Sequence, residues 1–264
     1  MKTGVLFKEV PATDTRVRID ASGSGIVEDD VKWEVNPYDE FALEEALRLL
    51  DAKKATEVVI VCLGPAHAEQ RIRDGLARGA TRAVWLKDPA YLGGDSLATA
   101  RALASAVRAE GIDLLLAGKV AVDDDNAQVP AMVAELLGWA QVTFAGKLEI
   151  DGTQFKATRD VGRGARAVVE GALPAVVTCD KGMNVPRYAS LPGIMKARSK
   201  PIVAKAPADL GLDPATLGKA GSQVVDTNWT LPPARPAGRV LQGETPEAVV
   251  KELVRLLREE AKVL

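Results

Sequence analysis

The sequence predicts an α/β protein with a doubly wound, mainly parallel sheet. Buried strand-like runs alternate with amphipathic segments every ~25 residues, which is the spacing of right-handed βαβ units. Ala, Val and Leu dominate the apolar residues and aromatics make up only 4% of the chain, as is typical of helices packed on a parallel sheet. Ligands of such sheets bind beyond the carboxyl ends of the strands, so we expect a site at the turns after Phe7, Leu63 and Ala117.

Capping and turn residues mark the elements of the first half. Asn36 and Pro37 suit the cap and the first position of a helix. Gly64-Pro65 turns a strand into a helix, and Asp95 caps a further helix. In order, we expect a strand at 5–7, a hairpin at 17–28 turning at Ser22-Gly23-Ser24-Gly25, a helix from 37, a strand at 57–63, a helix at 66–78, a strand at 80–86, a helix at 95–109, a strand at 112–117 and a helix at 126–137.

The second half is expected to add a hairpin and an arm. Runs at 142–150 and 154–160 flank the turn Asp151-Gly152, and an apolar strand follows at 173–179. Residues 200–242 are rich in Pro, Gly and Ala, which predicts an extended arm ending in an amphipathic helix from Thr245-Pro246. We therefore divide the chain into a domain at 1–200 and an arm at 201–264. The arm either embraces a partner or packs on its own domain.

Composition excludes several classes of protein. Lys plus Arg total 34 and Asp plus Glu total 36, so no basic field exists for nucleic acid or an acidic membrane. Cys62 and Cys179 lie in apolar strands and read as buried thiols, not as a disulfide or a metal site. The chain start does not resemble a signal peptide, and no run approaches the ~20 apolar residues of a membrane span. A cytoplasmic protein without membrane insertion is expected.

Two further patterns do not indicate catalysis. Gly162-Arg163-Gly164-Ala165-Arg166-Ala167 fits G-x-G-x-x-A but does not lie between a strand and a helix. His67 is the only histidine and reads as a surface or capping residue. No P-loop and no nucleophile with a partner are found, so we expect no catalytic residues and no substrate turnover.

A polar loop follows the strand that ends at Gly118. It runs through Asp123, Asp124 and Asp125 into an expected helix, whose first N–H groups can hold a phosphate. Carboxylates repel phosphate, however. From the residues alone, a solvated acidic turn competes with a nucleotide loop.

The segment 180–197 is a shaped loop with unusual apolar content. Two prolines and two glycines shape it, and it carries Tyr188, Leu191, Ile194 and Met195. Such side chains pack somewhere, against a partner protein or in the chain's own core. Pro192 should hold Leu191 in an extended conformation.

These two segments resemble electron transfer flavoprotein β subunits. The family pattern L-P-A-V-V-T, N-x-P-R-Y, L-P-x-I-M-K-A corresponds to 173–197, and G-K-x-A-x-D-D-D-x-x-Q corresponds to 118–128. Val129 departs from members with a hydroxyl residue at that position. The resemblance implies a sheet of the adenine-nucleotide-binding type and an αβ heterodimer, in which β holds AMP structurally while FAD lies mainly in the α subunit.

The resemblance also assigns residues to roles. Cofactor contacts, with AMP or at the flavin edge, are implied for Leu6, Asn36, Tyr38, Leu63, Gly118, Lys119, Val120, Ala121, Asp123, Asp125, Asn126, Ala127, Gln128, Val129 and Asp160. Of these, Tyr38 and Asp160 would approach the flavin. Docking of a dehydrogenase is implied for Arg187, Tyr188, Leu191, Pro192, Ile194, Met195 and Lys196.

The implied function is electron transport. The β subunit would help to carry electrons from flavoprotein dehydrogenases, such as those of fatty acid oxidation that act on acyl-CoA, to a membrane quinone oxidoreductase. The alternative is an electron-bifurcating relative, in which β holds its own FAD and receives hydride from NADH. A nucleotide-binding signalling module on a similar sheet would not explain the segment 180–197.

Overall fold

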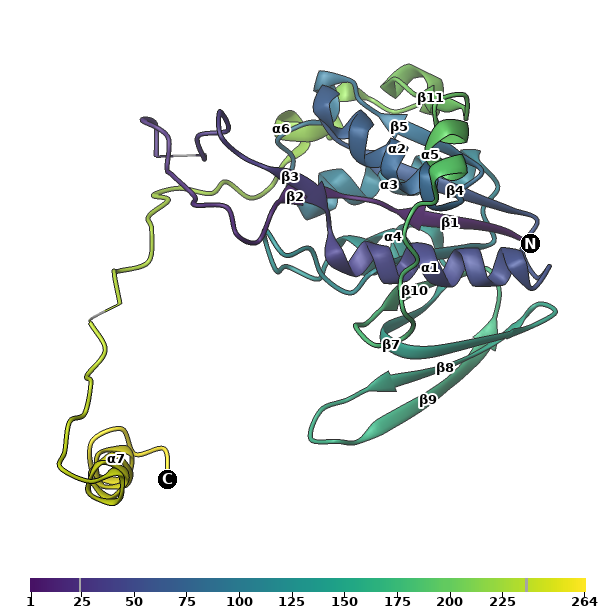
Figure 1. Ribbon diagram of the computed structural model, residues 1–264. Coiled ribbons are helices and arrows are strands. Elements are labelled where there is room, and N and C mark those ends of the chain that lie inside the picture. Colours follow the sequence, from purple (N-terminus) through teal and green to yellow (C-terminus); the bar gives the residue numbers. More distant parts are fainter. Residues whose placement is uncertain (24, 236) are drawn as a thin grey trace. The chain divides into compact units, whose positions relative to one another are not determined.

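The computed structural model describes residues 1–23, 25–235 and 237–264, and the chain forms two compact units (Figure 1). The first unit is Met1–Asn228 and the second is Trp229–Leu264. The turn predicted at 22–25 includes Ser24, which lies outside the described residues. Beside it, a single antiparallel bridge joins Ile19 to Ile26 in place of the predicted hairpin.

The first unit is built on a large sheet, for which the described residues give nine strands in the order β11-β5-β4-β1-β6-β10-β7-β8-β9. All neighbours from β11 to β7 pair in parallel, and β7, β8 and β9 pair antiparallel. The strands are β1 Lys2–Leu6, β4 Glu57–Leu63, β5 Arg82–Leu86, β6 Leu114–Gly118, β7 Ala140–Asp151, β8 Gln154–Asp160, β9 Arg166–Ala172, β10 Ala175–Cys179 and β11 Ile202–Ala204. A separate antiparallel ribbon joins β2 Glu9–Pro11 to β3 Trp33–Val35.

Helices cover both faces of the parallel strands. In the first unit the helices are α1 Pro37–Asp51, α2 Glu69–Arg78, α3 Ser96–Ala109, α4 Val129–Leu137, α5 Leu191–Ala197 and α6 Gly218–Gly221. The second unit contains the helix α7 Pro246–Glu259. Short 3-10 turns lie at Ala66–Ala68, Pro89–Tyr91, Pro207–Leu210 and Pro214–Thr216. Among the described residues, none of these helices has the length and apolar character to cross a bilayer.

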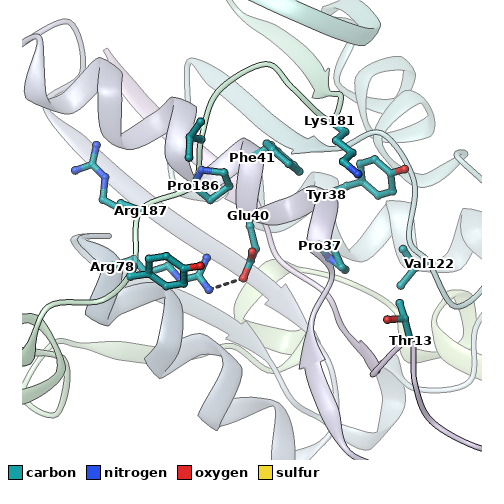
Figure 2. A pocket seen from close by; sticks show the side chains of 12 residues that line it. Thr13, Pro37, Tyr38, Glu40, Phe41, Arg78, Val122, Lys181, Pro186 and Arg187 are labelled. Atoms are coloured by element: carbon teal, nitrogen blue, oxygen red, sulfur yellow. Dashed lines mark hydrogen bonds and ion pairs between the residues drawn. The ribbon is translucent and has the colours of Figure 1, made fainter.

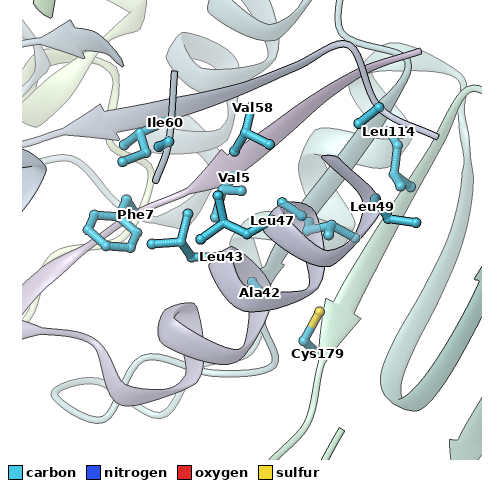
Figure 3. Close-up of a cluster of buried hydrophobic side chains, with 14 of the residues drawn as sticks. Val5, Phe7, Ala42, Leu43, Leu47, Leu49, Val58, Ile60, Leu114 and Cys179 are labelled. Atoms are coloured by element: carbon cyan, nitrogen blue, oxygen red, sulfur yellow. The ribbon is translucent and has the colours of Figure 1, made fainter. Parts of the chain in front are cut away.

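Alternate residues of each strand belong to opposite cores, because strand side chains point alternately to the two faces. Val58 and Ile60 pack with Leu43 and Leu47 of α1 in one core, part of which Figure 3 shows. Val59 and Val61 belong to the opposite core, to which α3 and α4 contribute Leu103, Val107 and Val133. The predicted doubly wound sheet is confirmed. Both cysteines are buried and free, as predicted.

Two strands of the sheet, β9 and β11, differ from the prediction. The segment 162–164 is a turn with positive φ at all three residues, and it leads into β9, which the sequence analysis missed. β9 alternates between half-buried and exposed residues, so its apolar signal is weak. The G-x-G-x-x-A pattern is therefore a strand connection, as its context indicated.

The first residues of the expected arm belong to the sheet. β11 is the edge strand beside β5, and Pro201 O accepts a hydrogen bond from Ala83 N at 3.0 Å. Edge pairing satisfies backbone groups that would otherwise be free, although a strand this short carries little sequence signal. The first compact unit thus extends to Asn228, beyond the expected boundary at residue 200. In the second unit, Thr245 Oγ1 caps α7 by accepting from Ala248 N, as predicted.

Candidate functional site

Three adjacent strands end at the edge of the sheet where the sequence predicts a ligand site. β4, β1 and β6 are neighbours and end at Leu63, Leu6 and Gly118. The start of α1 lies at the same edge, because Asn36 N donates to Lys8 O at 2.9 Å. Leu6, Asn36, Leu63 and Gly118 are therefore brought to one edge, as expected for a doubly wound sheet.

Asn36 joins the start of α1 to the loop after β6. Its Nδ2 donates to Val120 O at 3.0 Å, and its Oδ1 accepts from Val122 N at 3.3 Å. It occupies the N-cap position before Pro37, but its side chain makes no capping bond to the helix. The predicted cap and first positions of Asn36 and Pro37 are confirmed, but the Asn36 side chain bonds the loop and the Asp39 carboxylate instead of a backbone N–H of α1.

Asp39 is a buried carboxylate beneath this edge, and the sequence analysis missed it. Its Oδ2 accepts from Lys8 N at 2.8 Å. Its Oδ1 accepts from Asn36 Nδ2 at 2.9 Å and Gly118 N at 3.0 Å. Burial raises the pKa of Asp39 to about 7, against the opposing effect of these donors and the Lys8 charge. An acid in the first turn of a helix ordinarily reads as an exposed partner of the helix dipole, so the sequence gives little sign of this role.

Lys8 forms ion pairs with two of the three loop carboxylates and so offsets one of their negative charges. Its Nζ lies 2.8 Å from Asp123 Oδ1 and 3.0 Å from Asp124 Oδ2. Burial lowers the pKa of Lys8, but these two ion pairs outweigh it and hold the pKa above its ordinary value. Asp123 Oδ1 also accepts from Asp124 N at 3.0 Å, and Asp124 Oδ1 accepts from Asn126 N at 3.1 Å. These acids shape the loop, and Lys8 offsets part of their negative charge.

The loop continues farther than predicted before α4 begins. Asp125 and Ala127 have left-handed backbones, with φ of 53° and 54°, so the helix starts at Val129 and not at residue 126. Gln128 is the residue before the helix and makes no side-chain cap. The first N–H groups of α4 have no partner within the helix, which leaves them available to an anion. Val129 contributes no hydroxyl there.

A cationic and aromatic group lies beside the loop. Lys119 Nζ is 2.8 Å from Asp180 Oδ1, 5.1 Å from the centroid of the Tyr38 ring and 5.5 Å from that of Phe144. Burial lowers the pKa of Lys119, but the bond to Asp180 outweighs it and raises the pKa above its usual value. The ring of Tyr38, at the start of α1, therefore makes a cation–π contact with Lys119.

Asp160 lies at the end of β8 and is exposed. Its Oδ1 accepts from Gly162 N at 2.6 Å, which closes the turn to β9. No contact between described residues joins Asp160 to Tyr38 or Lys119. Its expected place facing a partner near the flavin stays a prediction.

Arg187 and Asn184 fasten the segment 180–197 to α1. Arg187 Nε and Nη2 lie 2.8 Å and 3.0 Å from the two oxygens of Glu44, and Nη2 lies 2.8 Å from Asp51 Oδ2. Asn184 Nδ2 donates to Phe41 O at 3.0 Å. The guanidinium of Arg187 is thus engaged within the chain.

The segment ends in a short helix, α5, where the sequence predicted only a loop. Ser190 Oγ caps it by accepting from Gly193 N at 3.2 Å, and Pro192 suits its first turn. The expected extended conformation of Leu191 is wrong, because Leu191 is the first helical residue and the extended one is Ser190. A Cβ on Gly193 would lie 2.3 Å from Ala77 O, so glycine allows α5 to approach α2 closely.

The apolar side chains of this segment face outward. Tyr188 is 94% exposed, Leu191 72% and Met195 68%, and Val185 and Ile194 are also exposed. Leu191 does not fill the chain's own core, so that alternative is excluded. Pro192 and Lys196 lie on the same short helix. We call residues 185–196 the docking segment. Exposed apolar surfaces of this kind are common at protein–protein binding sites, so this segment is a candidate for one.

A groove of about 520 Å³ lies between the docking segment and the start of α1 (Figure 2). Tyr38, Val122, Lys181, Pro186 and Tyr188 are among the residues that line it. A hydrogen bond between Arg78 and Glu40 lies within it.

The His67 side chain contacts the ribbon formed by β2 and β3. Its Nδ1 lies 2.7 Å from Glu9 Oε1, and its ring lies 4.8 Å from that of Trp33. It therefore joins the ribbon of β2 and β3 to the turn after β4. Across the described residues, no group of three or more His, Cys, Asp or Glu is placed to hold a metal ion.

The fold and its edge define an α/β protein of the doubly wound class, with a polar loop at the carboxyl ends of its strands and an exposed apolar segment beside it.

The electron transfer flavoprotein domain matches residues 24–210. The chain is 45% identical over 265 residues to the electron transfer flavoprotein subunit beta of Bradyrhizobium diazoefficiens, with all of both chains covered. It is 39% identical over 266 residues to that of Bacillus subtilis, again over all of both chains. Identity to the human subunit is 40% over 258 residues, 96% of this chain and 97% of the human one. The chain belongs to the electron transfer flavoprotein β-subunit family.

Proposed function

We propose that this chain is the β subunit of a heterodimeric electron transfer flavoprotein. It would help to carry electrons from flavoprotein dehydrogenases, such as those acting on acyl-CoA, to a quinone oxidoreductase. Family membership supports the electron-transfer role, and the names of the relatives support an α subunit as partner. The observation that carries the docking role is the exposed apolar segment held on α1 by Arg187 and Asn184.

The loop after β6 is our proposed site for AMP. The N–H groups at the start of α4 would hold the phosphate, and the backbone of residues 119–128 would enclose it. Lys8 supports this proposal because it offsets one of the two negative charges of Asp123 and Asp124. Leu6, Asn36 and Leu63 would border the rest of the nucleotide at the strand ends.

FAD would lie mainly in the α subunit and would accept and release the electrons. This chain needs no general base for that role, because a carrier supplies position and electrostatics. Tyr38, beside the Lys119 cation, would lie near the flavin, and Asp160 would face the α subunit. The arm at 201–264, with its amphipathic helix α7, would contact the α subunit as well.

Extraction of nucleotide from the isolated chain tests the AMP site. The chain is purified without its partner and denatured, and the released nucleotide is identified by mass. We expect AMP and little or no FAD. Stoichiometric FAD on this chain alone would contradict the carrier and support a bifurcating flavoprotein.

A further inference from the structure

α1 presents a row of carboxylates to the docking segment. Glu44 and Asp51 are seven residues apart and so lie on one face of the helix, where both meet Arg187. Their environments differ, because Glu44 is 7% exposed while the Asp51 side chain is 61% exposed. Exposed ion pairs contribute little to stability. The bidentate contact with the buried Glu44 is therefore the stronger anchor of Arg187.

The backbone of the segment is held at the same point. Arg187 N donates to Glu44 Oε2 at 3.1 Å, so one carboxylate binds both the guanidinium and the main chain. Asn184 adds a second anchor, with Nδ2 3.0 Å from Glu45 Oε2. Between and after these anchors, Val185 and Tyr188 point to solvent. The contacts of Asn184 and Arg187 with α1 therefore determine that Val185 and Tyr188 face the solvent.

We infer that Glu44 is the positioning residue of the docking surface. By holding the side chain and backbone of Arg187, it keeps the segment in the conformation that presents Tyr188 and Leu191 to a partner. A surface ordered in advance loses less conformational entropy when it binds. Glu44 itself does not touch the partner. This inference rests on the proposed docking function.

The first test is cleavage by trypsin of the heterodimer, because trypsin needs a free Arg187 side chain to cut the bond to Tyr188. In the wild type this bond is expected to resist. Glu44→Gln keeps the shape of the side chain and removes its charge, and should speed cleavage after Arg187 about fivefold. The bond after Lys181 is the internal reference and should not change. Asp51→Asn, which affects the exposed partner of the same arginine, should have a smaller effect.

The second test is steady-state reduction of the heterodimer by an acyl-CoA dehydrogenase. Glu44→Gln should raise KM about tenfold, or ~1.4 kcal/mol, with kcat unchanged. Leu191→Ala should weaken docking less in the Glu44→Gln background than in the wild type, because a disordered segment presents its anchor poorly. Melting temperatures of all variants are measured on the same preparations.

The two possible failures are distinguishable. If Leu191→Ala alone leaves KM unchanged, the docking function is overturned, and the role of Glu44 with it. If Leu191→Ala raises KM while Glu44→Gln changes neither KM nor cleavage after Arg187, only the positioning role is overturned. In that second case a lowered melting temperature would show that Glu44 serves stability alone.

Discussion

Among single residues, Asp39 has the most unusual chemistry. It joins the end of β1, the start of α1 and the end of β6 through one carboxylate. Burial raises its pKa from 3.8 to about 7. Between these values the folded protein keeps a proton that the unfolded chain has released. The free energy of unfolding therefore falls as pH rises through this range, by at most about 4 kcal/mol.

Asp39→Asn should remove this pH dependence. The substitution also sets an NH2 donor against an N–H group that Asp39 accepts from, and the cost of that lost hydrogen bond does not depend on the titration of the Asn variant. Urea denaturation at pH 5 and pH 8 should show the wild type losing roughly 2 kcal/mol or more relative to the variant between the two values. Asp125→Asn, at an exposed acid of the same loop, is the control and should track the wild type. Equal pH slopes for wild type and Asp39→Asn would contradict this account.

Asp160→Ala is expected to change the flavin without affecting the nucleotide. The residue is exposed at the end of β8, where a partner can meet its carboxylate, and it lies outside the loop proposed for AMP. Loss of a charge-assisted contact should shift the reduction potentials of the heterodimer. Redox titration beside Asp151→Ala, at the opposite end of the hairpin, is the measurement. Unchanged potentials would make Asp160 an ordinary turn residue.

The sequence predicts residue positions better than residue contacts. Periodicity predicted that the turns after Phe7, Leu63 and Ala117 lie at one edge, whereas Leu6 and Asn36 were assigned to it by the family resemblance. The burial of Asp39 and its bonds depends on strands far apart in the sequence, which periodicity does not reveal. The compensation of Asp123 by Lys8 spans 115 residues and was missed for the same reason.

At the scale of elements, α1 supports both candidate sites. Its first turn carries Asn36 and Tyr38 beside the nucleotide loop, and its later turns carry Glu44 and Asp51 beneath the docking segment. The helix itself was predictable from its cap position, its proline and its apolar face. That its polar face binds the segment 184–187 was not, because acids on a helix usually read as a solvated face.

Leu191→Ala tests the docking segment directly. Leu191 is 72% exposed, so its truncation should leave the melting temperature, FAD and nucleotide unchanged. An anchor worth ~2 kcal/mol would weaken binding to a dehydrogenase roughly 30-fold. Affinity and melting temperature are measured on one preparation. Unchanged affinity would defeat the docking role.

Gly193→Ala tests the packing of α5 on α2. A Cβ at this position would lie 2.3 Å from Ala77 O, so the helix must shift. We expect a loss of roughly 1–3 kcal/mol in the free energy of unfolding, together with weaker docking. Gly146→Ala, whose Cβ would lie 4.0 Å from its nearest neighbour, is the matched control. A variant as stable as this control would show that α5 is not closely packed.

For the whole molecule, the sequence predicted the alternation of strands and helices and hence the two cores. It did not predict β11 as part of the sheet, because three residues after a proline resemble an arm. β9 was missed because an exposed edge strand carries few large apolar residues. β4 was predicted at its observed bounds, since burial on both faces leaves an unbroken apolar run, whereas β1 was expected at 5–7 and lies at Lys2–Leu6.

The central claim is a carrier with one flavin, in which this chain holds AMP. The most direct measurement is the content of FAD and AMP per heterodimer, after co-purification with an untagged α subunit and extraction of the bound cofactors. We expect one FAD and one AMP for each heterodimer. Two FAD and no AMP would contradict the carrier and identify an electron-bifurcating flavoprotein.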